Sequence, residues 1–307
     1  MDILMSFDFS VGRGADTTVN FILDHFTPAL DTIAMIIGIV TDGIEGGLLF
    51  IPQPAGIALL AVVALWRVGL SFAVFTVLSL WLVGHMGLWP SMIETLALVI
   101  AATLIAVLIG IPTGIAMARN DTVASTVRPV LDLMQTMPAF VYLIPAAMFF
   151  GLGAVPGTIA TVIFSMPPVV RLTNLGIRQV HSEFVEAGLA FGCTRMQLLT
   201  KVQVPNAMPS IMAGINQTIM LSLSMVVIAS MIGAGGLGNT VLTGIQRLDI
   251  GTGFEGGLAV VILAVILDRI TQSFGKKRPK LFGFPAFSKR SRKGIQSSFE
   301  PLVQNQK

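Results

Sequence analysis

The chain has 307 residues, of which 54% are hydrophobic and 11% are charged, and its formal net charge is +3. Soluble domains carry roughly 25% charged residues, so this composition excludes an ordinary soluble protein and indicates an all-α polytopic membrane protein. Cys193 is the single cysteine, which excludes a disulfide within the chain. We expect no cleaved signal peptide, because no basic region, short apolar stretch and A-x-A site follow one another near the start.

The N-terminal segment, residues 1–47, is acidic. Between residues 24 and 49, apolar runs alternate with Asp31, Asp42 and Glu45. This pattern is compatible with helices lying on the outer membrane face and equally with a solvated, poorly ordered arm. The acidic character favours an external position for the segment.

Seven apolar segments between residues 48 and 275 are expected to form about seven transmembrane helices, since a span needs about 20 residues. An arginine at the centre of one long first span costs about 2.5–3.5 kcal/mol. We therefore place Arg67 in a tight cytoplasmic turn between two spans. The predicted spans are Leu48–Trp66, Val68–Val83, Ile93–Met117, Pro138–Phe150 with its flanks, Val155–Val170, Ile211–Ile232 and Leu258–Ile270 with its flanks.

The basic residues predict the orientation of the spans. With the C-terminus inside, all of the 19 Lys and Arg residues except Arg13 and Arg247 lie on the inner side. Lys and Arg favour cytoplasmic loops, so seven spans place the N-terminus outside and the C-terminus in the cytoplasm. Residues 276–307 then form a basic cytoplasmic tail, expected to be disordered and attracted to anionic lipids.

The cytoplasmic loop of residues 171–210 is predicted to hold two short helices. Ser182 is expected to cap the first helix, because a serine side chain accepts a hydrogen bond from an early backbone N–H. An apolar face follows at i, i+3, i+4, i+7 spacing. Its residues are Phe184, Ala187, Gly188 and Phe191.

A glycine turn separates the two helices. Gly192 suits a left-handed helix end, and Thr194 with Gln197 matches the capping box of a second helix. Pro205 is expected to stop this second helix. The apolar face of the second helix is predicted at Met196, Leu199 and Val202.

A helix–turn–helix of this kind has three interpretations. A DNA-binding motif is disfavoured because membrane spans closely flank the element, so no nucleic-acid partner is expected. An interfacial loop without a partner is possible on physical grounds. A docking surface for a cytoplasmic partner is favoured.

The same loop resembles the EAA loop of ABC importer permeases. It reads Glu186-Ala187-Gly188, three residues, Gly192, nine residues, and then Val202 to Pro205. Gly188 stands where the family has a second alanine, while the spacing is intact. The resemblance implies that Glu186, Ala187, Gly188, Gly192 and Pro205 belong to an interface with a cytoplasmic ATPase subunit.

Longer runs resemble the glycine betaine/L-proline permease subfamily. The runs are LALVIAATLIAVLIGIPTGIAMAR (96–119), RPVLDLMQTMPAFVYLIPAAMFFGLG (128–153), PPVVRLTNLGIRQV (167–180) and GINQTIMLSLSMVVIASMIGAGGLG (214–238). The similarity covers about residues 40–275. It implies a type I ABC importer fold, a homodimer of permeases, two ATPase subunits and a separate external binding protein in a bacterial inner membrane.

Motifs for chemistry within this chain are weak. G-x-x-x-x-G-K-[ST] is absent, so ATP and Mg are expected on the partner ATPase, with no cofactor here. His25, His85 and His181 are far apart, so no metal site and no enzyme activity are predicted. The run from Gly233 to Gly238 matches G-x-G-x-x-G. It ends a membrane helix, and this favours helix packing or a hinge over nucleotide binding.

Intramembrane polar and aromatic residues mark either a translocation path or packing contacts. Pro138 is expected to kink the fourth span. Aromatic faces and methionine suit a quaternary ammonium cation. The candidates are Met137, Phe140, Tyr142, Asn216 and Gln217, and ordinary helix packing remains the alternative.

The sequence therefore predicts the membrane-spanning subunit of a binding-protein-dependent ABC importer. Its resemblance implies glycine betaine as the solute, followed by proline betaine, choline, carnitine and trimethylamine N-oxide. The alternatives are an ABC permease for another small solute, such as an amino acid, and a secondary transporter. A secondary transporter should carry ionisable residues in mid-span, and the predicted spans show none at depth.

Overall fold

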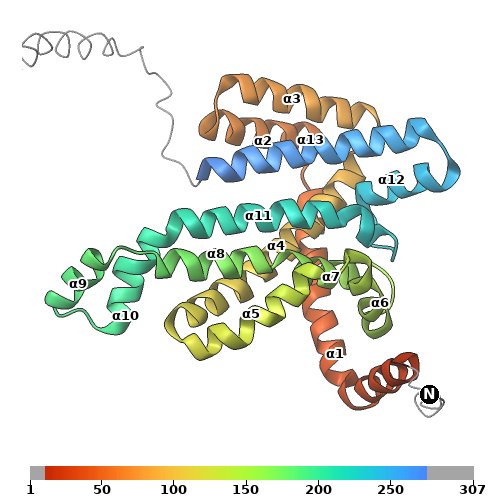
Figure 1. Cartoon of the computed structure of the whole chain (residues 1–307). Coiled ribbons are helices and arrows are strands. Elements are labelled where there is room, and N and C mark those ends of the chain that lie inside the picture. The colour runs from red at the N-terminus through yellow and green to blue at the C-terminus, as the bar shows by residue number, and fades with distance from the viewer. Residues whose placement is uncertain (1–10, 275–307) are drawn as a thin grey trace, which may run out of the picture. The chain divides into compact units, whose positions relative to one another are not determined.

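The computed structural model describes residues 11–274, and this part of the chain is built of successive helices without a strand (Figure 1). The predicted tail, residues 276–307, lies outside the described residues. The helices are α1 (Val11–Leu49), α2 (Gln53–Arg67), α3 (Leu70–His85), α4 (Trp89–Arg119), α5 (Asp121–Thr136), α6 (Ala139–Phe150), α7 (Ala154–Ser165), α8 (Pro167–Arg178), α9 (Ser182–Ala190), α10 (Arg195–Leu198), the π-helix η1 (Leu199–Gln203), α11 (Val204–Ser230), α12 (Gly236–Arg247) and α13 (Ile250–Phe274).

Helix α1 occupies most of the acidic N-terminal segment, which favours the helical alternative over a poorly ordered arm. It contains Pro28, and an internal proline bends a helix; Figure 1 shows α1 bent. Ile37 and Thr41 are buried, and Gly38 lies against Val155 of α7. Residues 16–49 are long and apolar enough to cross a membrane, although they are not among the seven predicted spans. The position of α1 on the outer face stays a prediction.

The seven predicted spans overlap helices of unequal length, and the fifth runs from α7 into α8, so its bounds are not those of one helix. Five helical stretches, including α1, are long and apolar enough to cross a membrane, or six if the bent pair α5–α6 counts as one span. Helices α2 and α3 have 15 and 16 residues. At about 1.5 Å per residue they are shorter than the hydrocarbon core of about 30 Å. Helices α5 and α6 meet at 101°, so the kink predicted at Pro138 is a complete break.

The tight turn predicted at Arg67 is confirmed. Arg67 ends α2, and Gly69 (φ 134°) precedes α3. The Arg67 side chain is buried, and its guanidinium donates to the Ser273 carbonyl at 2.8 Å. The same group lies 4.0 Å from the Phe274 ring centroid. These contacts compensate the burial of the charge and fix the α2–α3 hairpin to the end of α13.

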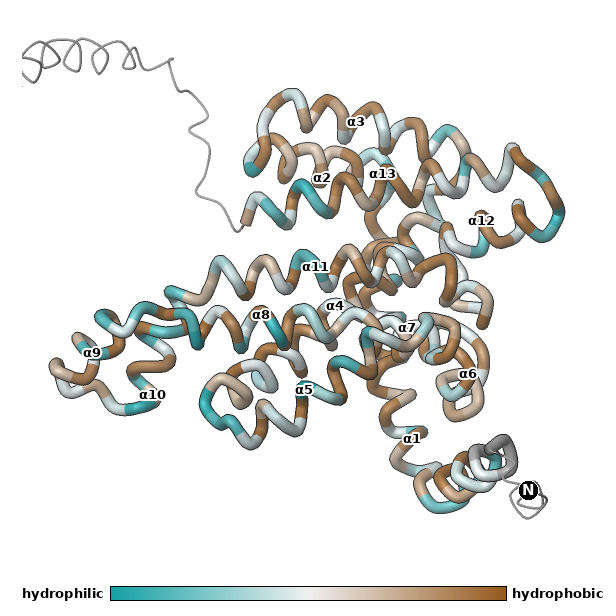
Figure 2. Tube along the Cα trace, viewed as in Figure 1, coloured by the Kyte–Doolittle hydropathy of each residue, from teal (hydrophilic) through white to brown (hydrophobic). Residues whose placement is uncertain are grey.

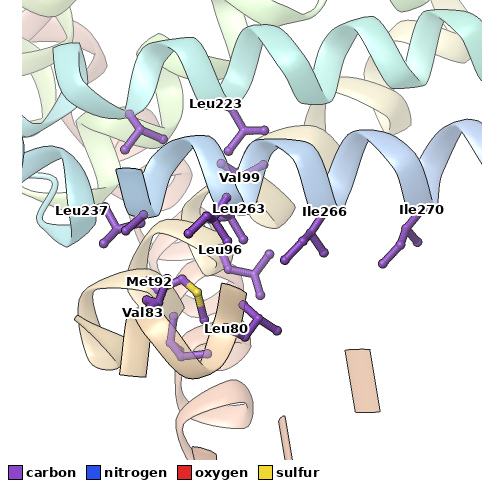
Figure 3. Packing of buried hydrophobic residues seen from close by; sticks show 14 residues of the cluster. Leu80, Val83, Met92, Leu96, Val99, Leu223, Leu237, Leu263, Ile266 and Ile270 are labelled. Carbon is purple, nitrogen blue, oxygen red and sulfur yellow. The ribbon is translucent and has the colours of Figure 1, made fainter. Parts of the chain in front are cut away.

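Two regions of close packing hold the helices together, one built of large apolar side chains and one of glycines. Leu80, Leu96, Leu223, Leu237 and Leu263 belong to the largest buried cluster, which joins α3, α4, α11, α12 and α13 (Figure 3). On the other side of α11, glycines let α8 approach both α4 and α11. A Cβ on Gly114 of α4 would lie 2.7 Å from the Val170 carbonyl oxygen, and one on Gly214 of α11 would lie 3.0 Å from the Val169 Cα. Small residues at such contacts let backbones pack directly.

Candidate functional site

The loop predicted as a docking surface lies between α8 and α11, and Figure 2 shows both hydrophilic and hydrophobic residues along α9 and α10. Arg178 at the end of α8 holds the base of this loop. Its guanidinium donates to the Met117 carbonyl at 2.7 Å and to Asp121 Oδ1 at 2.6 Å. The loop is therefore attached to the end of α4 and the start of α5. Sequence reasoning missed this role, because the partners lie 61 and 57 residues away.

A second ion pair joins α8 to α5. Arg171 Nη2 lies 2.5 Å from Asp132 Oδ1. Both side chains are substantially exposed, so the pair contributes little stability by itself. Together with the Arg178–Asp121 pair, it joins α5 to α8 at two points along α5.

The glycine turn after α9 forms as predicted. Gly192 has φ 76°. Its N–H donates to the Leu189 carbonyl at 2.9 Å, and the Cys193 N–H donates to the Gly188 carbonyl at 3.0 Å. These two bonds form a Schellman motif, in which the left-handed residue is usually glycine. The predicted serine cap is wrong, because Ser182 is the first helical residue and the N-cap is His181, which makes no side-chain cap.

The second helix begins as predicted but does not end at Pro205. The capping box is present, with Thr194 Oγ1 accepting from the Gln197 N–H at 3.3 Å and Gln197 Oε1 accepting from the Thr194 N–H at 2.9 Å. Helix α10 then continues through the π-helical turn η1 into α11. Pro205 lies in the first turn of α11, where its missing N–H is tolerated. Loop and membrane helix are thus continuous.

The apolar face predicted on α9 is largely exposed. Only Gly188 is buried there, and a Cβ on Gly188 would lie 2.7 Å from Leu198 Cδ1. Gly188 thus allows α9 to pack closely on α10, while Glu186 and Ala187 are exposed. Met196 of α10 is exposed, and Leu199 of η1 is buried. The exposed fractions of the large apolar side chains are 50% for Phe184, 54% for Leu189, 90% for Phe191 and 62% for Met196. We call these four residues the loop patch.

The predicted path residues fall in two separate places. Tyr142 is buried, and its hydroxyl donates to the Met134 carbonyl at 2.7 Å across the α5–α6 corner. Met137 packs beside it, whereas Phe140 is 54% exposed. Asn216 and Gln217 instead line a pocket of about 310 Å³ between α11 and α13. The structure does not bring the five residues together into one path.

Asn216 belongs to a polar network at the end of α13. Its amide donates to Asp268 Oδ1 at 3.1 Å, and its carbonyl accepts from Thr271 Oγ1 at 2.6 Å. Gln272 Nε2 donates to both oxygens of Asp268, at 2.7 and 2.8 Å. Asp268 is thus held by the amides of Asn216 on α11 and Gln272 on α13, and interhelical packing accounts for Asn216 without a path.

The glycine run 233–238 packs closely against α4 and α11, which is one of the two roles predicted for it beside a hinge. Gly233, Gly235 and Gly236 have positive φ and turn the chain from α11 into α12. Glu94 of α4 accepts from the Gly236 N–H at 2.7 Å, and Thr95 Oγ1 accepts from the Leu237 N–H at 2.8 Å. The two side chains cap α12 from another helix.

The described part of the chain thus combines helices long and apolar enough to cross a membrane with an exposed loop patch whose second helix continues into α11. A family model described as binding-protein-dependent transport system inner membrane component matches residues 106–278. The chain belongs to this family, and it is therefore a multi-pass inner-membrane transport component with the type I ABC importer fold.

Named relatives extend the similarity. The chain is 49% identical over 259 residues to the glycine betaine/proline betaine transport system permease protein ProW of Escherichia coli (strain K12), covering 84% of this chain and 73% of the relative. It is 52% identical to the glycine betaine/carnitine transport permease protein GbuB of Listeria monocytogenes, covering 83% and 92%. An inward-facing structure of the MetNI methionine ABC transporter matches with TM-score 0.55 at 21% identity, covering 64% of this chain and 97% of that chain, which supports the fold alone.

Proposed function

We propose that this chain is the permease subunit of an ATP-driven, binding-protein-dependent importer of glycine betaine or a related quaternary ammonium solute. The identity of about half the residues to two permeases named for glycine betaine carries this proposal. Choline, proline betaine, carnitine and trimethylamine N-oxide are the further candidates, and an amino acid is the alternative class.

The proposed partners follow from the loop. A cytoplasmic ATPase subunit would cover the loop patch, with Glu186, Ala187, Gly188, Gly192 and Pro205 in or beside the contact. That subunit would bind ATP and Mg, and this chain would hold no cofactor and carry out no hydrolysis. An external binding protein and a second copy of the permease complete the proposed assembly.

The structure suggests how a movement of the loop would reach the membrane helices. Helix α10 runs without interruption into α11. Arg178 joins the end of α8 to α4 and α5, and Arg171 joins α8 to α5 through Asp132. A displacement of the docked loop would therefore shift α8, α11 and α5 together. We propose that these three helices respond to nucleotide-driven closure of the ATPases.

Orientation is also part of the proposal. The loop and the end of α13 face the cytoplasm, and the α12 end of the bundle and the N-terminus lie outside. Arg67, Arg171 and Arg178 then lie on the inner side, as positively charged residues generally do.

Competition during uptake tests the solute. Vesicles would contain the permease, its ATPase and its binding protein with ATP inside. Labelled glycine betaine would compete with unlabelled glycine betaine, choline, trimethylamine N-oxide or proline, and uptake of each competitor would also be measured in labelled form. Strong competition by glycine betaine itself and weak competition by proline supports the proposal. Uptake of a competitor without uptake of glycine betaine contradicts the proposed solute and retains the proposed class.

A further inference from the structure

A groove of about 400 Å³ lies between the start of α3 and the last part of α13. Its lining combines apolar side chains with one hydroxyl and one cation. The lining residues are Val68, Ser71, Phe72, Phe75, Val265 and Arg269. In Figure 1 the α2–α3 turn lies beside the end of α13, and the bond from Arg67 to Ser273 confirms this contact.

The cation of this groove has no acidic partner in the described part of the chain. Arg269 is exposed, and neither ion pair found among residues 11–274 includes it. Its neighbour Asp268 is held by Asn216 and Gln272 on the side of α13 that faces α11. The guanidinium of Arg269 is therefore available to an external anion beside an apolar groove.

The surface around the groove is of the kind that faces acyl chains. Leu70, Val74 and Leu78 of α3 are 70%, 50% and 62% exposed. The N-cap of α3 is Gly69, which offers no side chain to the first N–H groups of the helix. Uncapped N–H groups and the helix dipole favour an anion at this end.

We propose that the groove binds one anionic phospholipid. An acyl chain would lie along Phe72, Phe75 and Val265, and the phosphate would contact the Arg269 guanidinium and the Ser71 hydroxyl. A basic residue at the end of an apolar groove between membrane helices suits an anionic headgroup, because charge-assisted bonds to phosphate supplement acyl-chain contact. The proposal depends on the membrane location of the chain and is independent of the transported solute.

Native mass spectrometry of the full-length permease tests this site. Purified protein would be exchanged into detergent with equal amounts of phosphatidylglycerol and phosphatidylcholine carrying the same acyl chains, and bound lipids would be counted. Wild type should retain phosphatidylglycerol preferentially. Arg269→Gln should reduce this preference about fivefold, the effect of about one basic residue at an anionic surface. Arg269→Lys should keep most of it.

Arg247→Gln is the matched control, since Arg247 lies on α12, away from the groove. It should keep the wild-type preference. Ser71→Trp, which fills the groove without changing charge, should lose both lipids. Three results overturn the proposal: equal retention of the two lipids by wild type, an unchanged preference in Arg269→Gln, or a second copy of the chain covering the groove so that lipid is bound only after dimers dissociate.

Discussion

Replacement of Gly192 by valine tests whether the loop needs the left-handed backbone conformation of this residue. A Cβ at Gly192 would meet no atom within 4 Å, so side-chain clashes do not contribute. The cost comes from φ 76°, which a β-branched residue strongly disfavours. Holding a non-glycine residue in such a region costs about 1–3 kcal/mol. The population of loops with the present Schellman geometry should therefore fall about 5- to 150-fold.

The assay measures ATP-dependent uptake and co-purification of the ATPase subunit, at matched membrane insertion. Gly192→Val should lose most of both activities. Gly192→Asn is the control, because asparagine adopts the left-handed conformation more readily and should keep most of both. Wild-type uptake and ATPase binding by Gly192→Val would refute the argument that this turn positions the docking surface.

Three further predictions concern stability, measured as the unfolding midpoint in detergent. Glu94→Ala should cost about 1–2 kcal/mol, because the Gly236 N–H loses its cap, whereas Glu94→Gln keeps an acceptor and should cost less; equal losses would contradict the capping role. Gly114→Ala should cost about 1–3 kcal/mol, because its Cβ would meet the Val170 carbonyl at 2.7 Å. Gly257→Ala, where nothing lies within 4 Å, should be neutral or stabilising, and a similar loss at both positions would argue against tight α4–α8 packing. Arg178→Gln should destabilise more than Asp121→Asn, because Arg178 also bonds a backbone carbonyl and Asp121 is 90% exposed; the reverse order would contradict the proposed attachment of the loop.

Local rules predicted the features of the loop that depend on neighbouring residues. Gly192 was predictable because a helix end needs a left-handed residue, and the Thr194–Gln197 capping box because its two bonds span only three residues. Arg67 was predictable from the cost of an arginine within a span. In each case the physical constraint acts over a few residues or through the membrane.

Features that depend on distant partners were not predictable from the sequence. The cap of α12 by Glu94 joins residues 142 positions apart. Pro205 was predicted to end the second helix, but the chain continues through the π-helical turn η1 and Pro205 lies in the first turn of α11. Periodicity identified the apolar residues of α9 but not whether this chain covers them. Residue type alone predicted Tyr142 and Asn216 in one translocation path. In the fold, Tyr142 bonds to Met134 and Asn216 bonds to Asp268.

The most direct test of the account is the nucleotide dependence of uptake. Vesicles containing the permease, its ATPase and its binding protein would be loaded with ATP, with ADP or with a non-hydrolysable ATP analogue, and uptake of labelled glycine betaine would be measured. The account predicts concentrative uptake with ATP alone, and its loss when the ATPase subunit is omitted. Equal uptake under all three loading conditions would contradict the permease of an ATP-driven importer and favour a secondary transporter.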